Sequence, residues 1–434
     1  MSERTKNNEE SNETSEDHIS ALPDDLLLDV LSLLTADEAV QTCVLARRWR
    51  DLWRYLPSLS FVVEKPSAEA PTFRSTEHFN EFVNRLIALR EPLPLVDCEI
   101  DLYQTDTSEF NNDETFPYPY LNQWIEYALT CQAQFLRVIV DDRIDQKFLL
   151  NVPLVSRHLM TLHLNNVDLL CSMDFSSCTP VLEDLEVSSC DIHARTVSSR
   201  SLKHLYIVNC HFSIGYRTLF STPSLNSLHL AYFDGMIPLT ESMPLLERAF
   251  VRLEFSSDHR YCINFAVEDC GDQSRVGCFG YPNQSVLLNG LSNAINLVLI
   301  AGPEEYIFRS DLASCCVFGK LKSLVLNEWV AIIDLDTLAS VLQHSPIHER
   351  LTLRLEDSGH LVRAIGPEEN YGPREQPFAC THLKVVNIEC EQADEKVRKI
   401  LKLLSSCGIL AEQISIKKIY GFWLDRFSFE TLPE

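Results

Sequence analysis

The sequence predicts an α/β protein in which a short helical module precedes a long array of parallel strands and a further strand–helix–strand unit. Three observations support this fold class: leucines and tryptophans follow helical spacing near the N-terminus, one leucine phrase returns every 20 to 23 residues, and strand and helix patterns alternate after it. The expected boundaries are 1–17 for a disordered acidic tail, 18–60 for the helical module, 61–130 for a helix/strand linker, 131–360 for the repeats and 376–434 for the last unit.

Composition places the chain among ordinary globular proteins and excludes several partners. Of 434 residues, 45% are hydrophobic. The chain has 37 Lys and Arg residues and 62 Asp and Glu residues, which gives a net charge of −25. A chain this acidic repels phosphate backbones and anionic lipid, so neither nucleic acid nor a membrane surface is an expected partner. No apolar run is long enough to cross a bilayer.

The N-terminus and the 15 cysteines together bear on the cellular compartment of the protein. Met1 to His18 is polar and lacks the apolar core of a signal peptide, so we expect an intracellular protein, in the nucleus or the cytoplasm. Reduced thiols follow from that location, and no paired Cys/His spacing suggests zinc. We expect no metal and no cofactor.

The helical module begins at Pro23, which suits a helix start because proline needs no amide hydrogen bond there. Apolar residues from Leu26 to Leu34 then form one helical face, Thr35 to Glu38 has the form of a capping box, and RRWRDLWRYL places apolar residues on one face of a third helix. Three helices in about forty residues cannot bury all of these side chains among themselves. We expect part of this surface to bind another protein.

The segment LPDDLLLDVLSLLTADEAVQTCVLARRWRDLWRYLPSLSF resembles the F-box, with its Leu-Pro start and its Trp-rich third helix. The resemblance implies binding to the Skp adaptor and, through it, to a cullin in a ubiquitin ligase. It also implies that Trp49 and Trp53 are more internal. The residues it assigns to the adaptor-facing surface are Leu22, Pro23, Leu26, Val30, Leu31 and Val44. The alternative interpretation is that these residues are core positions of a helical domain.

A leucine phrase of the form L-x-x-L-x-L recurs in the middle of the chain. Its second leucine steps by 23, 20 and 23 residues, the period of leucine-rich repeats, in which stacked short strands bury a core that no single repeat could form. Four clear copies begin at Leu159, Leu182, Leu202 and Leu225, and looser copies follow near 246, 321 and 351. We expect a curved solenoid that is irregular between 254 and 289.

Residues that alternate with the inward leucines should face the open, concave side of such a solenoid. This predicts a continuous strip of His163, Glu186, Tyr206 and His229 as the surface that binds a substrate protein. Ordinary solvated positions are the alternative, with binding in the last unit or in the 254–289 insertion. Cys190 and Cys210 occupy a small-residue position of the repeat, where buried structural thiols are expected rather than catalytic ones.

The last unit combines the strand HLKVVNIEC, the helix EKVRKILKLLSSC and a strand near Ile414. It resembles the FBD domain found after leucine-rich repeats in plant F-box proteins. The three modules in this order resemble the plant F-box/FBD/LRR family. The implied function is substrate recognition in a Skp/cullin/F-box ubiquitin ligase.

Catalytic motifs are not found, so we expect a non-catalytic adaptor subunit. No GxSxG, HExxH or phosphate-loop phrase occurs, and Pro346 interrupts the pair His344 and His348. Two alternatives stay open: a non-ligase F-box scaffold or sequestering protein, and a plain repeat protein without a functional F-box. A small-molecule co-ligand would need a basic pocket, for which the candidates are Lys320, Lys322, Arg350 and Arg354.

Overall fold

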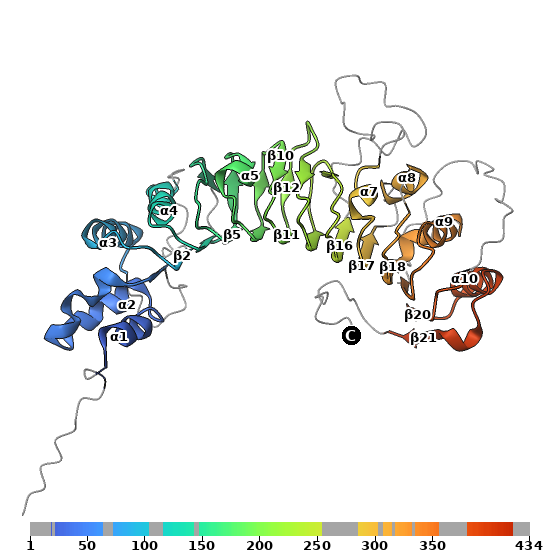
Figure 1. Cartoon of the computed structure of the whole chain (residues 1–434), viewed down its shortest axis with the longest axis horizontal. Helices are drawn as coiled ribbons and strands as arrows, with labels where there is room; N and C mark the ends of the chain where they lie inside the picture. The colour runs from blue at the N-terminus through green and yellow to red at the C-terminus, as the bar shows by residue number, and fades with distance from the viewer. Residues whose placement is uncertain are drawn as a thin grey trace, which may run out of the picture.

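The computed structural model is an arch with a helical cluster at its N-terminal end (Figure 1). It describes residues 19, 22–63, 73–103, 116–142, 147–253, 285–302, 307–314, 317–331, 335–355 and 380–419. The tail expected at 1–17, most of the irregular segment expected at 254–289 and the stretch 356–376 lie outside these residues. A single parallel sheet lines the inner side of the arch, and helices lie along its outer side.

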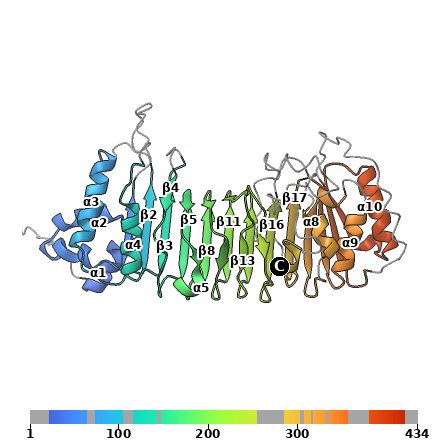
Figure 2. The ribbon, with the colours of Figure 1, turned by 90° about the horizontal axis from the view of Figure 1, so that it is seen from above.

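The main sheet has thirteen strands, and all its pairs are parallel. Figure 2 shows the strands side by side along the length of the molecule. In spatial order they are β1 (Ser58–Val62), β2 (Asp97–Leu102), β3 (Phe135–Val140), β5 (Thr161–Asn165), β8 (Asp184–Ser188), β11 (His204–Val208), β14 (Ser227–Ala231), β16 (Arg248–Leu253), β17 (Asn296–Ala301), β18 (Ser323–Asn327), β19 (Arg350–Leu355), β20 (Val385–Cys390) and β21 (Ile414–Lys418).

The four clear copies of the leucine phrase form β5, β8, β11 and β14, which confirms the predicted repeats. In β5, Leu162 and Leu164 are buried while His163 between them points to the other face. Register pairs Leu162 with Leu185 and Leu164 with Val187, so the leucines of successive repeats stack. Alternation in each strand therefore separates a buried face from an inner, concave face.

Two four-stranded parallel sheets run along the outer part of the repeats. Short strands suit this position because each repeat turns back there after only two or three paired residues. One sheet has the order β12 (His211–Phe212), β9 (Asp191–Ile192), β6 (Val167–Leu169), β4 (Phe148–Leu150); the other has β15 (Leu239–Thr240), β13 (Leu219–Ser221), β10 (Thr196–Ser198), β7 (Met173–Asp174), followed by the short helix α5 (Phe175–Cys178).

The N-terminal module contains α1 (Asp24–Leu31), α2 (Ala36–Gln41) and the 3-10 helices η1 (Thr42–Val44) and η2 (Arg47–Tyr55). The Glu38 carboxylate accepts the Thr35 backbone N–H at 3.1 Å, so the predicted capping box is present. The predicted third α-helix is wrong in type, because η2 is a 3-10 helix. Its two buried residues, Trp49 and Leu52, are three apart, the spacing that a 3-10 turn places on one side.

The predicted linker belongs to the sheet. Helices α3 (Thr76–Leu89) and α4 (Leu121–Thr130) cover β1, β2 and β3 and contribute Phe79 and Trp124 to the core. The rings of these two residues meet edge to face at 5.8 Å. The sheet therefore extends to the N-terminal side of the expected repeat interval 131–360.

Arg90 ties the helical module to the first strands. It is 5% exposed, and its guanidinium donates to the Leu56 carbonyl at 2.7 Å, to the Leu93 carbonyl at 3.1 Å and to the Tyr127 hydroxyl at 3.1 Å. Leu56 closes the module and Tyr127 lies on α4, so one buried cation joins three segments. The hydrogen bonds of its two terminal nitrogens offset the cost of burying this charge, while the buried Nε has no hydrogen-bond partner among the described residues.

The C-terminal half continues the same architecture with α7 (Leu288–Leu291), α8 (Ile307–Ser314), the 3-10 helix η4 (Glu328–Val330), α9 (Asp336–His344), α10 (Glu395–Ser406) and the 3-10 helix η5 (Ala411–Gln413). The expected last unit is part of the sheet too, because β20 pairs with β19 and β21 pairs with β20. Asp394 caps α10 by accepting the Val397 N–H at 3.0 Å.

A left-handed residue follows the strand in four successive repeats: Asn166, Ser189, Asn209 and Tyr232, with φ between 51° and 55°. This conformation crowds the Cβ of an L-residue, and asparagine tolerates it better than serine or tyrosine.

We expect Ser189→Asn to stabilise the protein by about 1 kcal/mol, because two neighbouring repeats already use asparagine at this position. Urea unfolding of the full chain measures the change. Ser227→Asn, in the extended strand β14, is the matched control and should give no gain. An unchanged or lower midpoint for Ser189→Asn would contradict the strain argument.

Candidate functional site: an apolar module surface and a concave ladder

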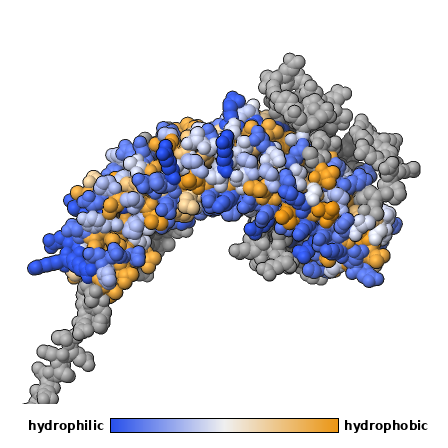
Figure 3. Space-filling model, viewed as in Figure 1, coloured by the Kyte–Doolittle hydropathy of each residue, from blue (hydrophilic) through white to orange (hydrophobic). Residues whose placement is uncertain are grey.

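The helical module exposes large apolar side chains to solvent (Figure 3). Of the residues assigned to the adaptor-facing surface, Leu26 is 49% exposed, Val30 45% and Val44 82%. Leu26 and Val30 are one helical turn apart on α1, and Val44 lies on η1. Pro23 is exposed and Leu22 is half-buried.

Leu31 differs from this set. It is 1% exposed and packs in the module's own core, so it cannot contribute to an open surface as it stands. Its position explains the difference, because Leu31 lies one helical turn after the buried Leu27 and shares its face, about 100° around the helix from Val30. Trp49 is buried and Trp53 half-buried, as expected for internal residues.

Three exposed apolar residues were missed by sequence reasoning: Leu33 at 86%, Leu45 at 69% and Ile19 at 57% exposure. Leu33 lies in the turn after α1, and Leu45 directly follows η1. The sequence carries no signal for this exposure, because whether an apolar residue in a turn is covered depends on tertiary packing. They enlarge the apolar surface of the module.

The arch carries a second feature, a ladder of side chains along its concave face. Register places His163 beside Glu186, Glu186 beside Tyr206, and Tyr206 beside His229. The four predicted residues therefore lie on four successive strands in one row. The row begins with Ser60, Glu99 and Arg137 and continues past His229 through Phe250, Val298, Val325, Thr352, Asn387 and Ser415.

The ladder changes character along its length. Near its start, Glu99 and Arg137 form an ion pair, and His163 Nε2 lies 3.7 Å from Glu186 Oε2. Next comes an aromatic stack, in which the Tyr206 and His229 rings lie 4.4 Å apart. The His229 and Phe250 rings also lie 4.4 Å apart, at an interplanar angle of 8°. This sequence of polar, aromatic and apolar positions is the kind of surface that recognises another protein.

Burial changes the protonation of the stack. It lowers the pKa of His229 to about 4, so the imidazole is neutral at physiological pH. It also raises the pKa of Tyr206, and the neighbouring Glu186 charge adds to this effect. Neutral rings favour contact with apolar or aromatic groups of a ligand over ionic ones.

The structure brings two of the four candidate cations of a small-molecule pocket side by side, since the Lys322 carbonyl accepts the Arg350 backbone N–H at 2.9 Å, but it does not gather all four. Lys320 donates to the Pro244 carbonyl at 3.1 Å in the segment before β18, whereas Arg350 and Arg354 lie on β19. Arg354 Nε is 2.8 Å from Glu389 Oε2, so its charge is compensated. This arrangement gives no support to a co-ligand pocket.

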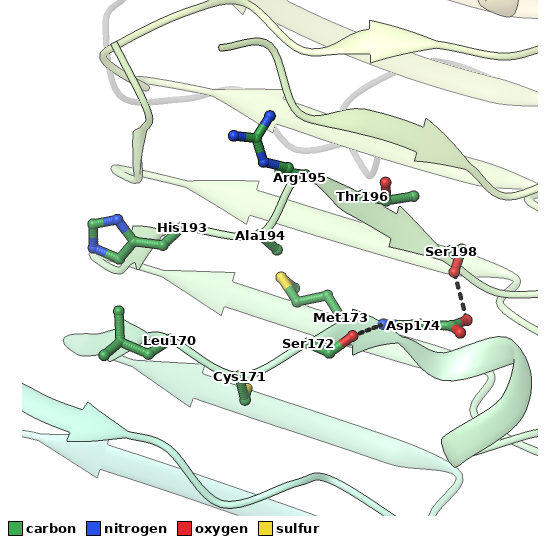
Figure 4. Close-up of a pocket in the computed structure, with 10 residues that line it drawn as sticks. All are labelled: Leu170, Cys171, Ser172, Met173, Asp174, His193, Ala194, Arg195, Thr196 and Ser198. Carbon is green, nitrogen blue, oxygen red and sulfur yellow. Dashed lines mark hydrogen bonds between the residues drawn. The ribbon is translucent and has the colours of Figure 1, made fainter. Parts of the chain in front are cut away.

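An open hollow of about 590 Å³ lies on the outer sheets (Figure 4). Its charged residues have partners: His193 Nε2 is 2.9 Å from Asp168 Oδ1, and the Arg195 guanidinium lies 4.4 Å from the Tyr216 ring centre. Asp174 accepts a hydrogen bond from Ser198 at 2.7 Å. These pairs hold neighbouring repeats together and leave no convergent set of reactive groups in the hollow.

The repeat cysteines are buried thiols. Burial raises the pKa of Cys98 and of Cys210 to about 12, and burial also raises the pKa of Cys190. Cys210 Sγ donates to the Val187 carbonyl at 3.4 Å, so it acts as a structural link between repeats. No group of three or more His, Cys, Asp or Glu among the described residues could hold a metal ion, and none of the described helices could span a membrane.

Comparison with known proteins identifies the module. The family model of the F-box domain matches residues 19–61. The chain carries an F-box. An Arabidopsis thaliana FBD-associated F-box protein is 30% identical over 54% of this chain and 57% of its own length. Two F-box/LRR-repeat proteins of the same plant are each 27% identical, one over 71% of this chain and 70% of the relative, the other over 90% and 95%.

These matches confirm the resemblance to plant F-box/FBD/LRR proteins. The chain covers 57% of the length of the first of these relatives, the FBD-associated F-box protein. The F-box match covers α1, α2, η1, η2 and most of β1, so the exposed Leu26, Val30 and Val44 belong to it. The FBD assignment of 376–434 stays a prediction.

The stacked His229 predicts a pH dependence of stability. Its folded pKa, about 4, lies below its ordinary value of 6.5, so the unfolded chain takes up the proton first. The stabilising effect of the neutral ring is therefore complete above pH 6.5 and is lost as the pH falls from 6.5 towards 4.

We expect His229→Phe to keep the stack and to remove this loss. Between pH 7 and pH 4.5, the urea midpoint of the variant should fall less than that of the natural chain. His344→Phe, on the outer helix α9, is the matched control and should fall as the natural chain does. Equal falls for all three proteins would show that His229 is not held neutral.

Proposed function

We propose that the protein is the substrate-recognition subunit of a Skp/cullin/F-box ubiquitin ligase. In this function the F-box binds the Skp adaptor, the adaptor brings the cullin, and the repeats bind a target protein for ubiquitination. The observation that carries the proposal is the solvent-exposed apolar surface of the F-box. Such a protein would act in the nucleus or the cytoplasm and would leave the chemistry to other subunits.

The F-box surface supports binding to a partner on energetic grounds. Leu33 and Val44 are both more than 80% exposed, although a fully buried leucine or valine side chain gains roughly 1.5–3 kcal/mol. Several such residues in one small module mark an interaction site rather than a solvated face. Arg48 stabilises the module by donating through Nε to Asp24 Oδ1 at 2.8 Å, which links η2 to α1.

The concave ladder supports binding of a target protein. It presents charged, aromatic and apolar groups on neighbouring strands, with spacings set by the sheet rather than by flexible loops. Tyr206 is 39% exposed, and aromatic residues of this kind dominate protein interfaces. Glu186, in the middle of the predicted strip, favours a target segment that carries positive charge.

A non-ligase scaffold remains the second candidate, because the same F-box surface would serve both functions. Reconstitution with purified Skp adaptor and cullin separates them. Recovery of a stable complex that contains cullin supports the ligase. Adaptor binding without cullin supports the scaffold or sequestering function.

We expect Val44→Asp and Leu45→Asp to weaken adaptor binding by at least ~30-fold each, because a buried charge replaces an apolar contact at the interface. Calorimetric titration with purified Skp adaptor measures the affinity. Leu149→Asp, at an exposed repeat position, is the matched control and should bind normally. Leu22 and Pro23 changed together to alanine should also reduce binding, and undiminished binding by all these variants would remove the assigned surface.

We expect Glu186→Lys and Tyr206→Ala to reduce target recovery at least ~10-fold, because both alter the middle of the ladder. Affinity capture with a proteasome inhibitor present, quantified against the natural chain, measures the effect. Glu126→Lys on the outer helix α4 is the charge-matched control. Normal recovery by the ladder variants, with unchanged thermal stability, would place the target elsewhere.

A further inference from the structure

The concave ladder is buried at one place only. Phe250 on β16, Val298 on β17 and Val325 on β18 are 4%, 2% and 2% exposed. On one side of them Tyr206 is 39% exposed, and on the other side Val385, on the concave face of β20, is 41% exposed. The three residues form an apolar cluster with Ala231 that is separate from the main core.

The described helices do not account for this burial. They lie along the outer side of the arch, whereas the cluster lies on the inner side (Figure 1). The stack with His229 shields one face of Phe250 but does not reach Val298 or Val325 on the next two strands. Val208, Tyr232 and Ile300 pack against the cluster from β11, the end of β14 and β17. Because these residues belong to the sheet itself, burial of the cluster's outward side calls for another part of the chain.

We propose that the C-terminal segment 420–434 binds this apolar cluster and acts as an intramolecular ligand of the concave face. Five of its fifteen residues are aromatic, compared with 9% in the whole chain. They are Tyr420, Phe422, Trp423, Phe427 and Phe429. Aromatic rings suit a flat cluster of valines and one phenylalanine, because they bury large areas at small cost in rotamer entropy.

The segment starts at the correct edge and is long enough. All strands of the sheet are parallel, so β21 ends at the same edge as β16, β17 and β18. Five strand intervals separate β21 from β16, a lateral distance of roughly 24 Å at ~4.8 Å per interval. Fifteen extended residues reach up to about 50 Å, so the segment spans this distance with length to spare.

Charge is complementary too. Residues 420–434 carry Asp425, Glu430, Glu434 and one arginine, a net charge of 1 − 3 = −2. Arginines lie at same-face positions beside the cluster: Arg248 and Arg252 on β16, and Arg350 on β19. An acidic aromatic segment fits an apolar centre with a cationic border. The other long segment outside the described residues near this part of the sequence, 254–284, is less rich in aromatic residues, with five in thirty-one.

The test uses the full chain with the photo-reactive residue p-benzoylphenylalanine at Phe427. After irradiation and digestion, mass spectrometry should find cross-links within one chain to peptides that contain Phe250, Val298 or Val325. Val298→Ser together with Val325→Ser should reduce their yield several-fold. Thr352→Ser, at the next ladder position, is the matched control and should leave the yield unchanged. Cross-links only to other regions, or only between two chains, would overturn the proposal.

A second measurement does not depend on the cross-linker. A fluorescent peptide of residues 420–434 should bind a chain that ends at Ile419 at least ~10-fold more tightly than it binds the full chain, where the tethered segment competes at high effective concentration. Circular dichroism and the urea midpoint verify that the shortened chain is folded. A folded shortened chain that does not bind the peptide would contradict the proposal, whatever the outcome for the adaptor.

Discussion

The parallel register of the main sheet is the constraint on which the rest of the structure depends. In each strand, alternate residues stack on the same positions of the neighbouring strand, as Leu164 does on Val187. A shift of one residue between two strands would move the leucines to the concave face and the ladder into the core. The same register that buries the core therefore also builds the candidate binding surface. Neither can change without the other.

The sheet also joins the two candidate surfaces into one body. β1 starts three residues after η2 ends, and it pairs with β2 along its whole length. Arg90 closes the junction from the other side through the Leu56 carbonyl at 2.7 Å. The F-box and the concave face are therefore held at a set distance and orientation. In the proposed function, this rigidity would replace a flexible linker and would pre-organise a bound target.

The sequence alone predicts those parts of the fold in which apolar residues recur with a regular spacing. The spacing of the leucine phrase predicts β5 to β14 and, with it, the row from His163 to His229, because strand alternation is a local property. It could not predict that the linker and the last unit join the same sheet, since strand pairing between β1 and β2 or between β19 and β20 depends on contacts across long loops. It could not predict the exposure of Leu33 and Leu45 either. Whether a leucine in a turn is covered depends on tertiary packing alone.

Continuity of the sheet decides how the function of the C-terminal unit can be studied. Removing residues 376–434 would delete β20 and β21 and leave β19 as a new edge with unpaired backbone groups. Loss of target binding after such a deletion would then reflect damage to the sheet as readily as loss of a receptor. Single substitutions along the ladder avoid this ambiguity, because side chains such as Tyr206 point away from the main core. A chain that ends at Ile419 avoids it too, since every paired residue of β21 is retained.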